Sequence, residues 1–87
     1  MENYPLKPND RAGIKIKIRN KVRFLEAPAK LLEGLPSEDQ RAITEQVGNI
    51  MEVEGFDNYG HVELVFYDKS GTNHSIWVKP NVLLVQS

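Results

Sequence analysis

The sequence predicts a small, mainly β protein: a five-stranded antiparallel barrel with one or two short helices inserted after the first strand. Apolar and polar residues alternate along several short stretches, which is typical of strands with one buried face. Clusters of glycine, proline, asparagine and aspartate separate these stretches, as tight turns require. The 87 residues have room for one hydrophobic core. We therefore expect a flexible N-terminal arm over residues 1–12 and a single domain over residues 13–87.

The first strand is expected over residues 14–19, where isoleucine alternates with a basic residue. In a pleated strand this order places the isoleucines on the buried face and the bases on the solvent face. The apolar series continues at Val22 and Phe24. Because Asn20 interrupts the series, the strand either bends there or stops and restarts.

A helical insertion that caps one end of the barrel is expected at about residues 27–47. Pro28 suits a first helical turn and Gly34 suits a helix end, which together indicate one or two turns. Ser37 and Gln40 have the spacing of a capping box, in which each side chain bonds the backbone N–H of the other residue. A second helix then runs to about residue 47, with a narrow apolar stripe formed by Ala42, Ile43 and Val47.

The rest of the chain indicates four more strands separated by turn residues. They are expected at residues 49–56, 61–67, 75–78 and 82–85. The first two of these flank a turn at residues 57–60 and form the clearest hairpin in the sequence. The last strand is entered directly or through a single helical turn at Pro80.

The order of these elements resembles the SH3-like barrel. The stretches that carry the resemblance are residues 13–16, 47–50, 60–66, 76–78 and 83–85. Such barrels serve as peptide readers, nucleic-acid modules and subunits of larger enzymes. Peptide-reading members carry a tyrosine-containing loop where residues 26–47 here contain no aromatic residue, so the resemblance implies no reading of proline motifs. Residues 31–40, followed by an Ile-Trp-Val strand, are also similar to a group of short uncharacterised bacterial proteins, which implies no activity.

Composition excludes several classes of protein. The chain has no cysteine, which rules out disulfides, thiolate nucleophiles and sulfur-ligated metals. With no export signal and no apolar stretch of membrane-spanning length, a cytoplasmic protein without membrane contact is expected. A net charge of -1 argues against a dominant attraction to phosphate. The charge is nevertheless segregated, because residues 7–30 are mainly basic and residues 33–68 mainly acidic.

Three aromatic residues are candidates for contact with a partner protein: Tyr59, Tyr67 and Trp77. If the apolar residues that alternate with them point inward, Tyr67 and Trp77 lie on one outer face. Tyr59 lies in the hairpin turn. Exposed aromatic side chains of this kind grip partner chains or stack on bases. The alternative is that Trp77 is a core residue covered by the inserted helix or the N-terminal arm.

Five bases form a candidate site for an anion or a nucleic acid: Lys15, Lys17, Arg19, Lys21 and Arg23. With no acid between them, they could neutralise several phosphates, and the binding would depend strongly on salt. Two alternatives need no ligand. Alternating bases protect an edge strand from pairing with another molecule, and they also pair with acidic residues on a neighbouring strand.

The remaining titratable residues indicate neither a metal site nor a catalytic site. His61 and His74 lie near strand starts without a third ligand at a spacing that fixes metal geometry. Glu52, Glu54 and Glu63 alternate with apolar neighbours, which predicts solvated side chains with ordinary pKa values. No cofactor, metal or catalytic residue is therefore expected.

The sequence thus predicts a binding module rather than an enzyme. The first hypothesis is docking on a protein partner or on a second copy, as a monomer or weak homo-oligomer. The alternative is weak nucleic-acid binding, with the five bases contacting phosphates and the aromatic residues stacking on bases.

Overall fold

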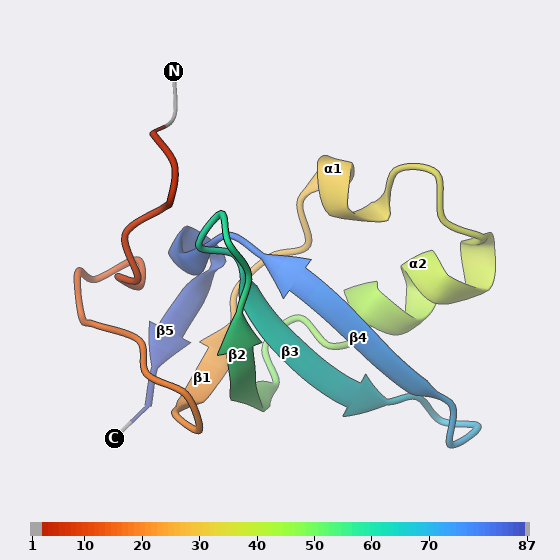
Figure 1. Cartoon of the computed structure of the whole chain (residues 1–87). Helices are drawn as coiled ribbons and strands as arrows, with labels where there is room; N and C mark the ends of the chain where they lie inside the picture. The colour runs from red at the N-terminus through yellow and green to blue at the C-terminus, as the bar shows by residue number, and fades with distance from the viewer. Residues whose placement is uncertain (1–2, 87) are drawn as a thin grey trace.

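The computed structural model describes residues 3–86 of the chain, so residues 1–2 of the expected arm and residue 87 of the expected domain lie outside the described residues. Its elements follow in the order β1 (Lys21–Phe24), α1 (Ala29–Leu32), α2 (Ser37–Thr44), β2 (Ile50–Phe56), β3 (Val62–Tyr67), β4 (Asn73–Val78), a 3₁₀ turn η1 (Pro80–Val82) and β5 (Leu83–Val85) (Figure 1). The expected mainly β character is confirmed.

The five strands form one antiparallel sheet in the order β4-β3-β2-β1-β5. β2 joins the two halves, and its register shifts between Val53 and Gly55, where it leaves β1 and pairs with β3. The expected closure into a barrel is not seen, because β4 and β5 are the two ends of the strand order and do not pair with each other in the described chain. The sheet therefore has two edges (Figure 1).

The expected strand over residues 14–19 is wrong. In that segment Ile16 is buried, whereas Ile14 and Ile18 are 52% and 58% exposed. The Asn20 side chain accepts a hydrogen bond from the Lys17 N–H, and the Asn20 N–H donates to the Lys17 carbonyl. These bonds close a turn over residues 17–20, and the chain first bonds the sheet at Arg19 and Asn20, whose N–H and carbonyl groups pair with Val53 of β2. The strand starts only at Lys21, which agrees with the restart beyond Asn20.

The helical insertion is confirmed, but the capping box is wrong. α2 begins at Ser37 without a side-chain cap. Gln40 instead donates to the carbonyls of Leu32 and Leu35, so its side chain joins α2 to the end of α1. Of the expected apolar stripe, Ala42 and Ile43 are buried in the core, while Val47 lies beyond the helix and is 40% exposed.

The later strands agree with the sequence pattern. Val62, Leu64 and Phe66 of β3 are buried, as the alternation predicts. They belong to one hydrophobic cluster with Ile76 and Val78 of β4. The single helical turn at Pro80 is also present, as η1.

The N-terminal arm lies beside β5, on the opposite side of the molecule from α2 (Figure 1). The Arg11 N–H donates to the Leu83 carbonyl of β5, and the Ile16 N–H donates to the Pro8 carbonyl within the arm. Asp10 is 5% exposed and is buried between the arm and β5. These contacts place residues 6–16 against the sheet, while the expected flexibility of the arm stays a prediction.

Candidate interaction surface at the open edge of the sheet

Three turns in the described part of the chain share one hydrogen-bonding pattern, and each begins with an aspartate. One carboxylate oxygen accepts from the backbone N–H groups two and four residues later, at 2.8 to 2.9 Å. The fourth residue is a glycine with a φ between 84 and 87°, a backbone conformation that favours glycine. These turns begin at Asp10, Asp57 and Asp68. Two of them set the ends of the β2–β3 and β3–β4 hairpins and so fix the register of those strands.

The second carboxylate oxygen of each aspartate holds a different group. Asp10 accepts from the Val85 N–H at 2.8 Å. Asp57 lies 2.9 Å from His61 Nδ1, and Asp68 lies 2.8 Å from His74 Nε2. An ionised carboxylate can only accept hydrogen bonds, so each facing histidine nitrogen carries the proton.

The environments of these aspartates lower their pKa values. Hydrogen bonds from His74 and the Ser70 hydroxyl hold the pKa of Asp68 well below its usual range. Burial raises the pKa of Asp57, but hydrogen bonds from His61 and the Tyr59 N–H outweigh it, and the pKa is lowered. For Asp10 the same balance holds, with backbone N–H groups including that of Val85 lowering the pKa. All three side chains are therefore acceptors at neutral pH.

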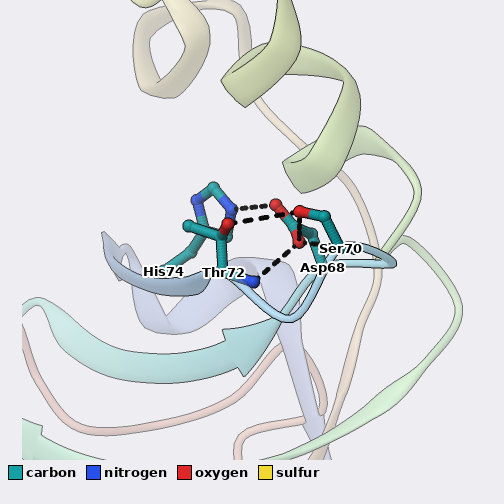
Figure 2. Close-up of polar contacts among 4 residues, drawn as sticks. All are labelled: Asp68, Ser70, Thr72 and His74. Atoms are coloured by element: carbon teal, nitrogen blue, oxygen red, sulfur yellow. Dashed lines mark hydrogen bonds and ion pairs between the residues drawn. The ribbon is translucent and has the colours of Figure 1, made fainter.

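The residues around Asp68 contain a serine, a histidine and an aspartate, but in a structural arrangement (Figure 2). The Ser70 hydroxyl donates to Asp68 at 2.7 Å and lies 3.2 Å from the Thr72 hydroxyl. In a nucleophilic triad the serine bonds the histidine, which removes its proton. Here the His74 ring instead stacks on Phe66 with centroids 5.0 Å apart. The cluster closes the hairpin.

The aromatic residues singled out in the sequence fall into two places. Tyr67 and Trp77 are 67% and 43% exposed. Their strand partners are Asn73 and Glu63, so they lie on the same outer face but four positions apart along β3, about 13 Å. Tyr59 packs in the turn against Tyr4, with ring centroids 5.8 Å apart. The three side chains do not form one continuous stacking surface.

Trp77 lines a groove of about 660 Å³ where β4, α1 and the N-terminal arm meet. The other walls include Tyr4, His61, Leu31 and Val78. Trp77 and Val78 are consecutive, and their side chains point to opposite faces of the sheet. A groove that touches both passes around β4 near the end of the strand, where Lys79 and Asn81 also line it. We call the side of β4 that faces away from β3 the open edge.

The backbone groups at the open edge can be assigned from the ladder. The Asp68 N–H donates to the Thr72 carbonyl, so the pair 68 and 72 is hydrogen-bonded. In antiparallel strands such pairs recur at every second residue, which gives His74, Ile76 and Val78 as the β4 residues bonded to β3. The N–H and C=O groups of the alternate residues, Asn73, Ser75 and Trp77, face the open edge. No other described segment pairs with them.

The five basic residues do not line one strand. Lys15 makes a single bridge with Asn9, and Lys17 and Arg19 lie in the turn that precedes β1. Arg19 and Lys21 both face Glu52 of β2, at 3.7 and 3.0 Å, and Lys21 lowers the Glu52 pKa by hydrogen bonding and by charge. Arg23 donates to the Gly48 carbonyl. The cross-strand pairing considered in the sequence is thus present for Lys21 and Glu52.

Sequence reasoning missed the residues that complete the groove. Tyr4 was assigned to the arm and Leu31 to a helix, and nothing in their local pattern predicts that they meet Trp77. For His61 the sequence offers a metal site or packing at the surface or across strands, and no pattern predicts its place in the groove. Within residues 3–86 no three histidine, aspartate or glutamate side chains are grouped so that they could hold a metal ion.

No helix among the described residues has the length and apolar content to cross a membrane. No protein-family model, curated protein or solved structure matches this chain.

Proposed function

We propose that this chain is a non-catalytic protein-interaction module that docks on a partner protein through the open edge of β4. The observation that carries the proposal is Trp77: a large aromatic residue, 43% exposed, that lines a groove beside backbone groups with which no described segment pairs. Tryptophan is enriched among the residues that dominate binding energy at protein interfaces.

The open edge also lacks the usual protection against strand pairing. Proteins keep exposed edges from pairing with charged side chains, prolines, bulges or very short strands. β4 has six residues, Asn-His-Ser-Ile-Trp-Val, with no lysine, arginine, aspartate, glutamate or proline. An edge of this composition supports a role in which another chain adds to it.

The narrower class that we propose is an SH3-like barrel that has not closed. The strand order β4-β3-β2-β1-β5, the register shift in β2 and the 3₁₀ turn before β5 support this assignment. The fold alone does not select a function, so the proposal depends on the groove and the edge.

Nucleic-acid binding through the five bases is less well supported. Glu52 already faces two of them, and this acid would oppose a phosphate at the same place. The remaining bases are spread over a bridge, a turn and β1. An arrangement of this kind neutralises fewer phosphates than the expected row on one strand.

The test compares three immobilised proteins in extract of the cell that makes this chain: wild type, Trp77→Ala, and the double variant Lys17→Glu with Arg19→Glu. We expect one protein to be retained by wild type and by the charge-reversed variant and to be lost with Trp77→Ala. Circular dichroism checks that each variant is folded. Retention of oligonucleotides that is lost on charge reversal, with no effect of Trp77→Ala, would overturn the proposal.

A further inference from the structure

We infer that the partner of the open edge is an extended, acidic segment of another protein, which adds to β4 as a further antiparallel or parallel strand. This inference rests on the proposed function and names the chemistry of the partner. Its support comes from the backbone groups of β4, the position of the groove and the charge around it.

The backbone of β4 offers hydrogen bonds to an extended chain. The N–H and C=O groups of Asn73, Ser75 and Trp77 face away from β3, and no described segment bonds them. An extended segment meets such a row at alternate residues, with hydrogen bonds from its own backbone. The geometry therefore favours a strand-like ligand.

The groove gives the ligand a preferred position along β4. It contacts Trp77 on one face of the sheet and Val78 with Leu31 of α1 on the other. Alternate side chains of an added strand also point to the two faces. One apolar side chain would pack beside Trp77, and its neighbour would pack beside Leu31.

The charge of the residues that line the groove favours an acidic ligand. The charged residues that line the groove are Glu26, Lys30 and Lys79. Glu26 is already paired with Arg11, whereas no acid of the described chain lies within ion-pair distance of Lys30, which is exposed on α1. Lys30 therefore offers a positive charge at the groove, although the whole chain has a net charge of -1. A glutamate or aspartate near the end of the ligand would meet Lys30.

A second copy of this chain fits the same edge less well. Pairing β4 with β4 would leave Lys30 of each copy without an acidic partner from the other strand. β4 itself has no acidic residue to offer in return. The charge pattern thus favours a different chain as the partner.

The test uses a capped eight-residue peptide in which valine alternates with threonine and which carries one glutamate at each end, so that a glutamate lies near Lys30 in either strand direction. Amide chemical shifts of the isotope-labelled protein are followed while the peptide is added up to millimolar concentration. We expect saturable shifts at Asn73, Ser75 and Trp77, and smaller shifts at His74 and Ile76, whose amides are bonded to β3. Binding without that alternation, or no binding, would overturn the inference.

Two matched peptides separate backbone pairing from charge. Methylation of two alternate backbone nitrogens removes donors without changing charge, and we expect it to weaken binding at least about tenfold. Replacement of the two glutamates by lysines should also weaken binding about tenfold. Equal affinity for all three peptides contradicts the inference.

Two protein variants test whether the charge of Lys30 determines which peptide binds. Lys30→Glu should weaken binding of the acidic peptide about tenfold and improve binding of the lysine peptide. Arg41→Glu is the matched control, because Arg41 is exposed on α2 and does not line the groove. It makes the same change in net charge and should leave both affinities within about twofold. An equal effect of the two variants would show that the net charge of the protein determines the affinity. It would contradict a specific contact between the peptide and Lys30 in the groove.

Sedimentation of the unliganded protein tests whether two copies of the chain associate. A dimer at micromolar concentration that blocks the peptide-induced shifts at β4 overturns the inference in favour of self-association. If a cellular partner requires Trp77 but neither peptide binds and Lys30→Glu has no effect, the proposed function stands and this inference fails.

Discussion

The two edges of this sheet differ in what lies against them. Along β5, the arm places a backbone hydrogen bond on Leu83 and the Asp10 carboxylate on the Val85 N–H. Along β4, the backbone groups of alternate residues have no partner in the described chain, and an exposed tryptophan lies beside them. Because both edges belong to one antiparallel sheet, the difference is set by the segments around the sheet.

The comparison indicates how a small sheet can keep one edge available. Exposed edges invite aggregation, and proteins usually cover or charge them. The β5 edge is short and is covered by residues that precede the sheet in the chain. The β4 edge keeps its full length, and only its end at the groove is flanked by α1. The four predictions below test this contrast, starting with the largest expected effect.

Asp10→Ala should expose the β5 edge and cause the largest loss of stability. The Asp10 carboxylate accepts from the N–H groups of Ala12, Ile14 and Val85, and it is buried. Leaving these donors without an acceptor should lower the free energy of unfolding by about 3–4 kcal/mol. Urea denaturation measures this loss in the free energy of unfolding. Asp10→Asn keeps one carbonyl oxygen for the turn and should lose about half as much; equal losses would mean that the hydrogen bonds within the turn contribute nothing and that the contact with Val85 accounts for the whole loss.

Gly60→Ala should destabilise the protein more than Gly71→Ala, although the two glycines occupy the same position of the same kind of turn. A Cβ at Gly60 would lie 2.5 Å from the Leu6 carbonyl oxygen of the arm, whereas a Cβ at Gly71 meets nothing within 4 Å. Both changes carry the cost of a positive φ, about 1 kcal/mol. The clash at Gly60 should raise its total to about 2–3 kcal/mol. Thermal unfolding of the two variants measures the difference, and its absence would show that the arm does not press on this turn.

Acid should weaken the fold through the aspartates of the three turns. Their pKa values are lowered in the folded state, so the unfolded chain takes up protons first, near its ordinary pKa of about 3.9. Stability is therefore fully present above about pH 5 and is lost as the pH falls through 4 and below. Urea midpoints at a series of pH values give the curve. The curve of Asp10→Asn should be flatter, because one of the three carboxyls no longer titrates.

Trp77→Thr should have the smallest effect on stability, within about 1 kcal/mol, because the side chain is 43% exposed and threonine suits a strand. The same change should abolish binding at the open edge. A large loss in the thermal unfolding temperature would mean that Trp77 acts as a core residue, which was the alternative reading of the sequence. Val78→Thr, at the buried neighbour, is the control that should destabilise the protein.

The sequence was sufficient where the structure is local. The β2–β3 and β3–β4 hairpins follow from alternating residues on either side of Asp-x-x-Gly turns, whose hydrogen bonds span only four residues. The inward series of β3 and the outward exposure of Tyr67 and Trp77 follow from the same alternation. Hydrogen bonds between residues close in the chain leave a clear pattern in the sequence.

The sequence was insufficient where distant segments meet. The isoleucines of residues 14–18 alternate as in a strand, but the Asn20 side chain closes a turn and two of the three isoleucines remain exposed. The role of Asp10 depends on Val85, 75 residues away. Gln40 bonds the end of α1 and not its own helix start. No periodicity reports such contacts, so the closed edge and the groove could not be predicted, and the cytoplasmic location stays a prediction.

The arm touches both edges of the sheet, since Tyr4 lines the groove beside β4 and Asp10 covers β5. The six residues from one to the other span at most about 21 Å, so this segment is a short tether. A partner that binds Tyr4 would also restrain the backbone of the arm that covers Val85. A partner bound at the β4 edge would then slow hydrogen exchange of backbone amides at the β5 edge, without any movement of the sheet between the two edges.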